Sequence, residues 1–79
     1  MIRFRLKELI AEWEFQHGQK LTLEKISSST GIHRVTLSKI ANIRGYSTTT
    51  ENVEKICRFF DCPIQMLMER VPDENSVKG

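Results

Sequence analysis

The most informative part of the sequence is LTLEKISSSTGIHRVTLSKIANIR, residues 21–44. Thr22 is a good N-cap for a short helix in which Ile26 is the buried position. The polar run 27–30 has low helix propensity, and Gly31 is suited to end that helix in a left-handed conformation. A second helix can then begin near His33. Two helices joined by a tight turn with glycine form a helix-turn-helix unit, which we expect over residues 22–42.

The second helix of this unit has two chemically different faces. Leu37, Ile40 and Ala41 form an inward apolar stripe, and the outward face consists of His33, Arg34, Val35, Ser38, Lys39 and Asn42. In a helix-turn-helix the second helix lies in the DNA major groove, with its N-terminal residues at the base edges. Arg34 and Lys39 can donate to guanine, Ser38 can bond to several base edges, and Val35 can pack on a thymine methyl.

The charge distribution supports a polyanionic partner. The 79 residues carry twelve Lys and Arg against ten Asp and Glu, a net charge of +2 that is uninformative by itself. Residues 20–44, however, hold five basic side chains and one acidic one, net +4, and residues 33–44 contain no acid at all. Such clustering is the electrostatic footprint of a nucleic-acid-binding surface.

The rest of the chain reads as short helices. Leu6, Leu9, Ile10 and Trp13 have helical spacing, and Gly18 is a plausible end for this first helix. A fourth helix follows Thr48 or Thr49, either of which can cap it, and a fifth follows Pro63 and buries Ile64 and Leu67. We therefore expect an all-α bundle of five short helices.

Both ends of the chain differ from this helical pattern. Ile2, Phe4 and Leu6 alternate with two arginines, which fits a short strand ahead of the first helix. Residues 72–79 contain almost nothing to bury and are expected to form a flexible tail. The expected organisation is one domain over residues 1–71 followed by that tail.

Residues 21–42 resemble the Cro and phage-repressor-type helix-turn-helix family, often called the XRE family. Thr30-Gly31-Ile32 and residues 34–40 match its turn and recognition helix most closely. The resemblance extends over residues 3–69 and implies a five-helix, lambda-repressor-like fold that binds duplex DNA. It also implies that Arg34, Val35, Ser38 and Lys39 face bases, and that Thr22, Leu23, Thr36, Asn42 and Arg44 lie near the DNA backbone.

The sequence departs from the family pattern at three places. Leu23 replaces a common glutamine, so only its backbone N–H remains there as a phosphate donor. Ile10 and Ala41 replace an Arg–Glu pair; because both charges are lost together, the change is compatible with the fold. His33 stands where Ser or Thr usually caps the recognition helix; it is either a phosphate contact or an uninvolved surface residue.

Other function classes are disfavoured. Cys57 and Cys62 are too few for a disulfide scaffold, and the C-x₄-C spacing lacks a second ligand pair, so we expect no metal and no cofactor. No nucleophile motif or phosphate loop indicates an enzyme, and we expect no catalytic residues. The absence of a long apolar run and of a signal peptide favours a cytoplasmic, nucleoid-associated protein with no membrane partner.

The sequence therefore predicts a DNA-binding transcriptional regulator that acts as a repressor. The alternative is a protein-binding module of the same fold, such as an antitoxin-like protein or an adaptor. With no ligand-sensing domain in the sequence, regulation would come from abundance, cooperativity or a regulatory protein partner.

We also expect a homodimer on DNA, because one recognition helix reads too few base pairs for useful discrimination. Two segments could form the contact: the strand-like residues 2–5, or Ile64, Met66, Met68 and Val71 on and after the fifth helix. The second is preferred because a short strand contributes few hydrogen bonds.

Overall fold

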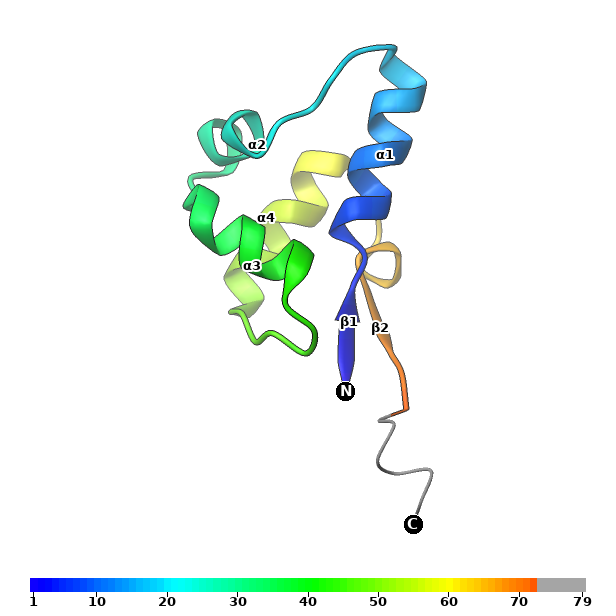
Figure 1. The fold of residues 1–79 in the computed structure, drawn as a ribbon, viewed down its shortest axis with the longest axis vertical. Helices are drawn as coiled ribbons and strands as arrows, with labels where there is room; N and C mark the ends of the chain where they lie inside the picture. The colour runs from blue at the N-terminus through cyan, green and yellow to red at the C-terminus, as the bar shows by residue number, and fades with distance from the viewer. Residues whose placement is uncertain (73–79) are drawn as a thin grey trace.

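The computed structural model describes residues 1–72, which form four helices, a 3₁₀ turn and two short strands (Figure 1). In chain order the elements are β1 (Ile2–Phe4), α1 (Leu6–His17), α2 (Leu23–Thr30), α3 (Arg34–Asn42), α4 (Thr50–Phe60), η1 (Ile64–Met66) and β2 (Met68–Arg70). Helix α2 packs against α3 and α4, and α1 packs against α3. The protein is thus a mainly helical domain with a helix-turn-helix unit and a small sheet.

The helix ends follow the local signals in the sequence. The Thr22 hydroxyl caps α2 by accepting the backbone N–H of Lys25 at 3.1 Å, and the Thr49 hydroxyl caps α4 by accepting that of Asn52 at 3.1 Å. Gly18 and Gly31 end α1 and α2 with φ of 65° and 81°. These positive angles favour glycine because a Cβ would be strained there.

The core contains one fully buried side chain from each of the four helices and one from the residue after η1. Leu6, Ile26, Leu37 and Ile56 come from α1, α2, α3 and α4, and Leu67 follows η1. Ile10 and Ala41 pack against this core from α1 and α3. The two positions where the family often has an ion pair are therefore filled by apolar contacts, as the joint loss of both charges suggested.

The prediction of a fifth helix is wrong. Pro63 does begin a helical turn, but η1 has only three residues, and the chain becomes extended at Met68. Strand β2 then pairs with β1 in antiparallel register, with Ile2, Arg3 and Phe4 opposite Arg70, Glu69 and Met68. The Arg5 N–H donates to the Leu67 carbonyl at 2.6 Å, so the sheet begins next to a core residue.

The short N-terminal strand is present, and its partner comes from the other end of the described chain. Arg3 pairs with Glu69 at 2.9 Å and with Glu8 at 2.7 Å, which links the sheet to the first turn of α1. Such exposed pairs contribute about 0–1 kcal/mol each, so backbone pairing and the burial of Leu67 hold the sheet in place. Apart from exposed Pro72, the predicted tail lies outside the described residues.

Candidate nucleic-acid interface

The turn between α2 and α3 is held by hydrogen bonds within the chain. The Thr30 hydroxyl donates to the Ile26 carbonyl at 2.7 Å and accepts the Ile32 N–H at 3.2 Å, while the Gly31 N–H donates to the Ser27 carbonyl at 2.8 Å. Ile32 is buried directly after the turn and anchors it to the core. The angle between the two helices is therefore set by both backbone and packing.

Helix α3 is buried on one side and open on the other, as its sequence predicts. Leu37 and Ile40 are buried, whereas Arg34, Val35 and Lys39 are exposed. Val35 is 59% exposed, a large fraction for a β-branched apolar side chain on a helix. The helix lies in front of α4 in the view of Figure 1.

The N-terminus of α3 can accept an anion. His33 is its N-cap residue, is exposed, and makes no side-chain capping bond. The first turn contains no acidic residue, and its free backbone N–H groups carry the positive end of the helix dipole. A phosphate at this position would therefore satisfy groups that the protein itself leaves open.

Arg34 has a partner that the sequence reasoning missed. Its Nε lies 3.5 Å from Glu24 Oε2, which joins the first residue of α3 to the first turn of α2. The pairing uses Nε, and within residues 1–72 no acidic group lies within ion-pair distance of the two terminal nitrogens of the guanidinium. Glu24 is the one acidic residue in segment 20–44, and that isolation was the available signal.

Ser38 and Asn42 are joined by hydrogen bonds along α3. The Asn42 amide donates to the Ser38 carbonyl at 2.9 Å and to its hydroxyl at 3.3 Å. Ser38 is half-buried, whereas Lys39 beside it is exposed. Within residues 1–72, Lys39 has no acidic partner within ion-pair distance, so its ammonium is available to an external anion.

The positions expected near the DNA backbone have mixed environments. Leu23 is half-buried and packs against the core, so its side chain is structural and only its backbone N–H can serve a phosphate. Thr22 is exposed beside it, and Thr36 is half-buried in the first turn of α3. Arg44 lies past the end of α3 and is exposed.

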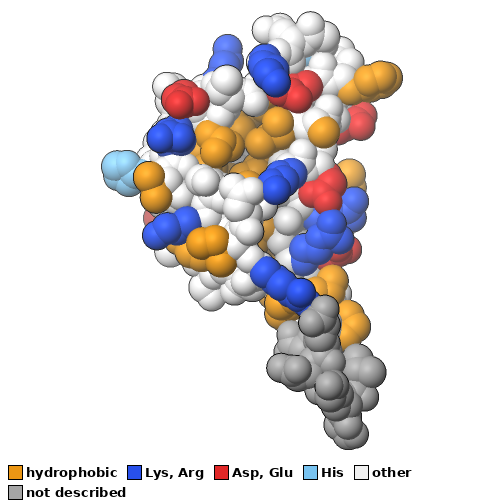
Figure 2. All heavy atoms as spheres, viewed as in Figure 1, with side chains coloured by type: hydrophobic (Ala, Val, Ile, Leu, Met, Phe, Trp, Pro, Cys, Tyr) orange, Lys and Arg blue, Asp and Glu red, His pale blue; other side chains and the backbone are white. Residues whose placement is uncertain are grey.

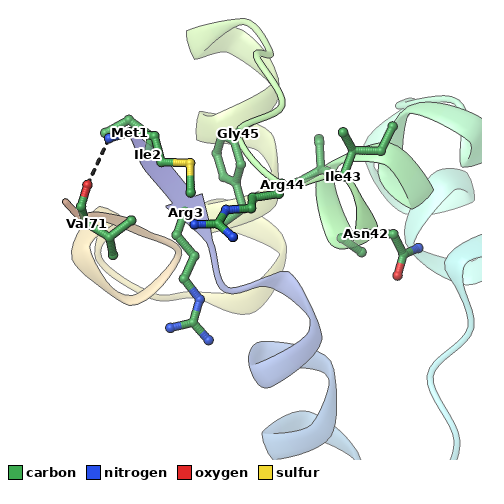
Figure 3. A pocket seen from close by; sticks show the side chains of 11 residues that line it. Met1, Ile2, Arg3, Asn42, Ile43, Arg44, Gly45 and Val71 are labelled. Atoms are coloured by element: carbon green, nitrogen blue, oxygen red, sulfur yellow. Dashed lines mark hydrogen bonds between the residues drawn. The ribbon is translucent and has the colours of Figure 1, made fainter. Parts of the chain in front are cut away.

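A groove of about 340 Å³ separates the end of α3 from β1. Asn42, Ile43 and Arg44 form one wall, and residues 1–4 with Val71 form the other (Figure 3). The Arg44 side chain extends over this groove toward β1. The sheet thus borders the same end of α3 that carries the last two predicted DNA contacts.

Basic side chains spread over the face that carries α2 and α3. Figure 2 shows them there and also over α1 and the sheet, where most of the acidic side chains seen from this side lie as well. Among residues 1–72, no three His, Cys, Asp or Glu side chains gather to hold a metal ion. No helix in this part of the chain is long and apolar enough to cross a bilayer.

Comparison with known proteins agrees with this geometry. The profile of one protein family, the Cro/C1-type HTH DNA-binding domain, matches residues 5–73. Searches of curated proteins and of solved structures found no match to the chain. The match spans α1 through β2 and includes the whole helix-turn-helix unit, so the chain belongs to the Cro/C1-type HTH DNA-binding domain family.

Proposed function

We propose that this protein is a sequence-specific regulator of transcription that represses a promoter by occupying an operator. One observation carries the proposal: α3 buries Leu37 and Ile40 and presents an acid-free face with Arg34, Val35 and Lys39 exposed. A helix held in this way suits the major groove. The family assigns DNA binding, and the outward chemistry of α3 supports reading of base edges.

In this proposal four residues read bases. Arg34 and Lys39 donate to guanine O6 and N7, and Val35 packs against a thymine methyl. Ser38 reads a base edge with its hydroxyl, which accepts a 3.3 Å hydrogen bond from Asn42 and can donate its own proton outward. Each good pairing of this type discriminates against a wrong base by about 1–3 kcal/mol.

The remaining predicted residues hold the protein on the DNA backbone. Thr22, the Leu23 N–H, Thr36, Asn42 and Arg44 would contact phosphate or sugar along the edges of the groove. His33 would add the open N-terminus of α3 to these contacts. Contacts of this kind fix the register of α3 but carry no sequence information.

We further propose that the protein binds DNA as a homodimer. Three or four reading side chains cover about four or five base pairs, which is little discrimination in a genome. Two copies related by a two-fold axis would read half-sites about 34 Å apart along the DNA.

The two segments proposed for the dimer contact differ in how much of each is accessible to a second copy. β1 is already paired with β2 on one side, so only its outer edge could pair with a second copy. Ile64 and Met66 are 55% and 50% exposed on η1, whereas Met68 is half-buried and packs against the core. The surface around Ile64 and Met66 therefore remains our preferred contact.

A dimer test follows from this difference. Ile64→Lys with Met66→Lys should abolish the dimer mass in sedimentation without touching the core. If the dimer persists, the outer edge of β1 is the contact. A protein that stays monomeric both at high concentration and on its best DNA site would contradict the dimer itself.

The proposed function is tested by selecting bound sequences from a random duplex library. Enrichment of a defined motif is expected, and two inverted half-sites about one helical turn apart would also report the dimer. Binding without enrichment would contradict sequence-specific regulation. Absence of DNA binding would favour the alternative, a protein-binding module such as an antitoxin-like protein.

A further inference from the structure

The C-terminal end of α4 brings two cysteines together. Asp61 follows the helix with φ of 53°, its N–H donates to the Arg58 carbonyl at 3.2 Å, and the Cys62 N–H donates to the Cys57 carbonyl at 3.0 Å. This pair of bonds is the Schellman motif, in which the side chains at the first and last bonded positions meet. An apolar contact usually occupies them, but here both positions are cysteine.

The two thiols are close and reachable from solvent. The two cysteines stand at the two ends of the backbone hydrogen bond that closes this motif, and both side chains are half-buried and unbridged. Cys57, Asp61 and Cys62 line a shallow surface hollow together with Glu54, Arg58 and Pro63. The backbone bonds hold the two cysteine backbones side by side, so rotation about χ1 is enough to bring the two sulfur atoms toward each other.

We propose that Cys57 and Cys62 form a reversible dithiol–disulfide site that exchanges with small-molecule disulfides of the glutathione class. The thiolate of one cysteine attacks the small disulfide, whose S–S bond breaks, and one small thiol leaves with a proton. The second thiolate attacks this mixed disulfide, and the other small thiol leaves. Two protein thiols are oxidised to one disulfide, and one small disulfide is reduced to two thiols.

The environment of the site favours response to the redox state of a thiol pool over rapid sensing of an oxidant. Burial raises the pKa of the Cys62 thiol, and the neighbouring Cys57 and the Asp61 carboxylate raise it further. A raised pKa lowers the thiolate fraction near neutral pH and slows attack. The site therefore reports the equilibrium between thiol and disulfide.

Closure would join α4 to the segment that leads into the sheet. Cys62 precedes Pro63 and η1, after which Leu67 enters the core and β2 pairs with β1. A disulfide here would restrain the unfolded chain between two positions that the native backbone already holds together, so the oxidised protein should be the more stable form. The hollow includes no residue of α2 or α3, so DNA binding should survive oxidation.

The test uses the full chain equilibrated in buffers of reduced and oxidised glutathione. The expected product is a single covalent chain whose mass has fallen by two hydrogen atoms, with one peptide cross-link between Cys57 and Cys62. Cys57→Ser and Cys62→Ser are matched controls, because a chain with one thiol cannot form the internal disulfide and instead retains bound glutathione.

The fit of the disulfide is measured by comparing closure in native protein with closure in denaturing urea. Native closure should be favoured on the order of tenfold, with a rise in Tm of roughly 5–10 °C that reducing agent reverses. Wild-type protein that retains bound glutathione, cross-links between chains, or melts at a lower temperature when oxidised would overturn the proposal. These readouts need no DNA, so they are independent of the proposed function.

Discussion

Replacing Arg34 by alanine separates base reading from general attraction to DNA. Arg34 is 57% exposed and its ion pair with Glu24, itself 71% exposed, spans 3.5 Å, so the pair adds at most about 1 kcal/mol to the folded state. The free energy of unfolding should therefore change little. The binding energy should fall more, because a bidentate guanine contact is worth about 1–3 kcal/mol. The best duplex should bind about 5- to 150-fold more weakly.

The specificity change is the decisive part of this prediction. Arg34→Ala should lose preference at one base pair, while duplexes already changed at that pair should lose far less affinity. The assay is titration of labelled duplexes carrying each single substitution of the selected site, at one fixed salt concentration. Thermal unfolding of the same samples checks that the fold is intact.

Arg58→Ala is the matched control. Arg58 is also an exposed arginine paired to a carboxylate, 2.7 Å from Glu54, but it lies on α4 outside the helix-turn-helix unit. The Arg58→Ala substitution removes the same charge as Arg34→Ala and should leave the base preference unchanged. If Arg34→Ala weakened every duplex by the same factor, Arg34 would be a phosphate contact and the base-reading assignment would be refuted.

Three further predictions concern neighbouring residues. Arg44→Ala should weaken all duplexes alike and reduce the salt slope of log K by about 1, measured by titration at several salt concentrations; a preserved slope would exclude a phosphate contact. Glu24→Gln removes a negative charge and the partner of Arg34 Nε, so it should strengthen non-specific DNA binding and relax the preference at the base pair that Arg34 reads. Glu54→Gln is the charge-matched control. If Glu24→Gln strengthened binding to all duplexes equally, Glu24 would have no role in positioning Arg34. Leu37→Ala should lower the free energy of unfolding by about 2–5 kcal/mol in urea, because Leu37 is fully buried; a loss below about 1 kcal/mol would contradict its place in the core.

The helix-turn-helix unit could be predicted because its signals are local. Thr22 caps α2 through a residue three positions away, and Gly31 ends it with a bond to Ser27. The inward and outward faces of α3 follow from the helical period, which placed Leu37 inside and Arg34 outside. Within such short spans the sequence determines both conformation and exposure.

The prediction of a fifth helix was wrong because the conformation of residues 64–71 depends on distant residues. Residues 64–71 have mixed apolar spacing that suits a short helix, yet Met68 pairs with Phe4 across nearly the whole chain. Leu67 must also reach the core, which ends the helical turn after three residues. The energy of strand pairing and burial comes from distant residues, and no local pattern reports it.

The candidate nucleic-acid interface also combines features set by local sequence with features set by contacts between distant residues. The helix-turn-helix, the acid-free outward face of α3 and the residues on it could be predicted from the sequence, because they depend on neighbours within about one or two helical turns. Three features became visible only in the folded chain: Glu24 pairs with Arg34, Leu23 packs against the core, and β1 borders the end of α3. Each of these depends on how separate elements pack, and packing is set by the whole core.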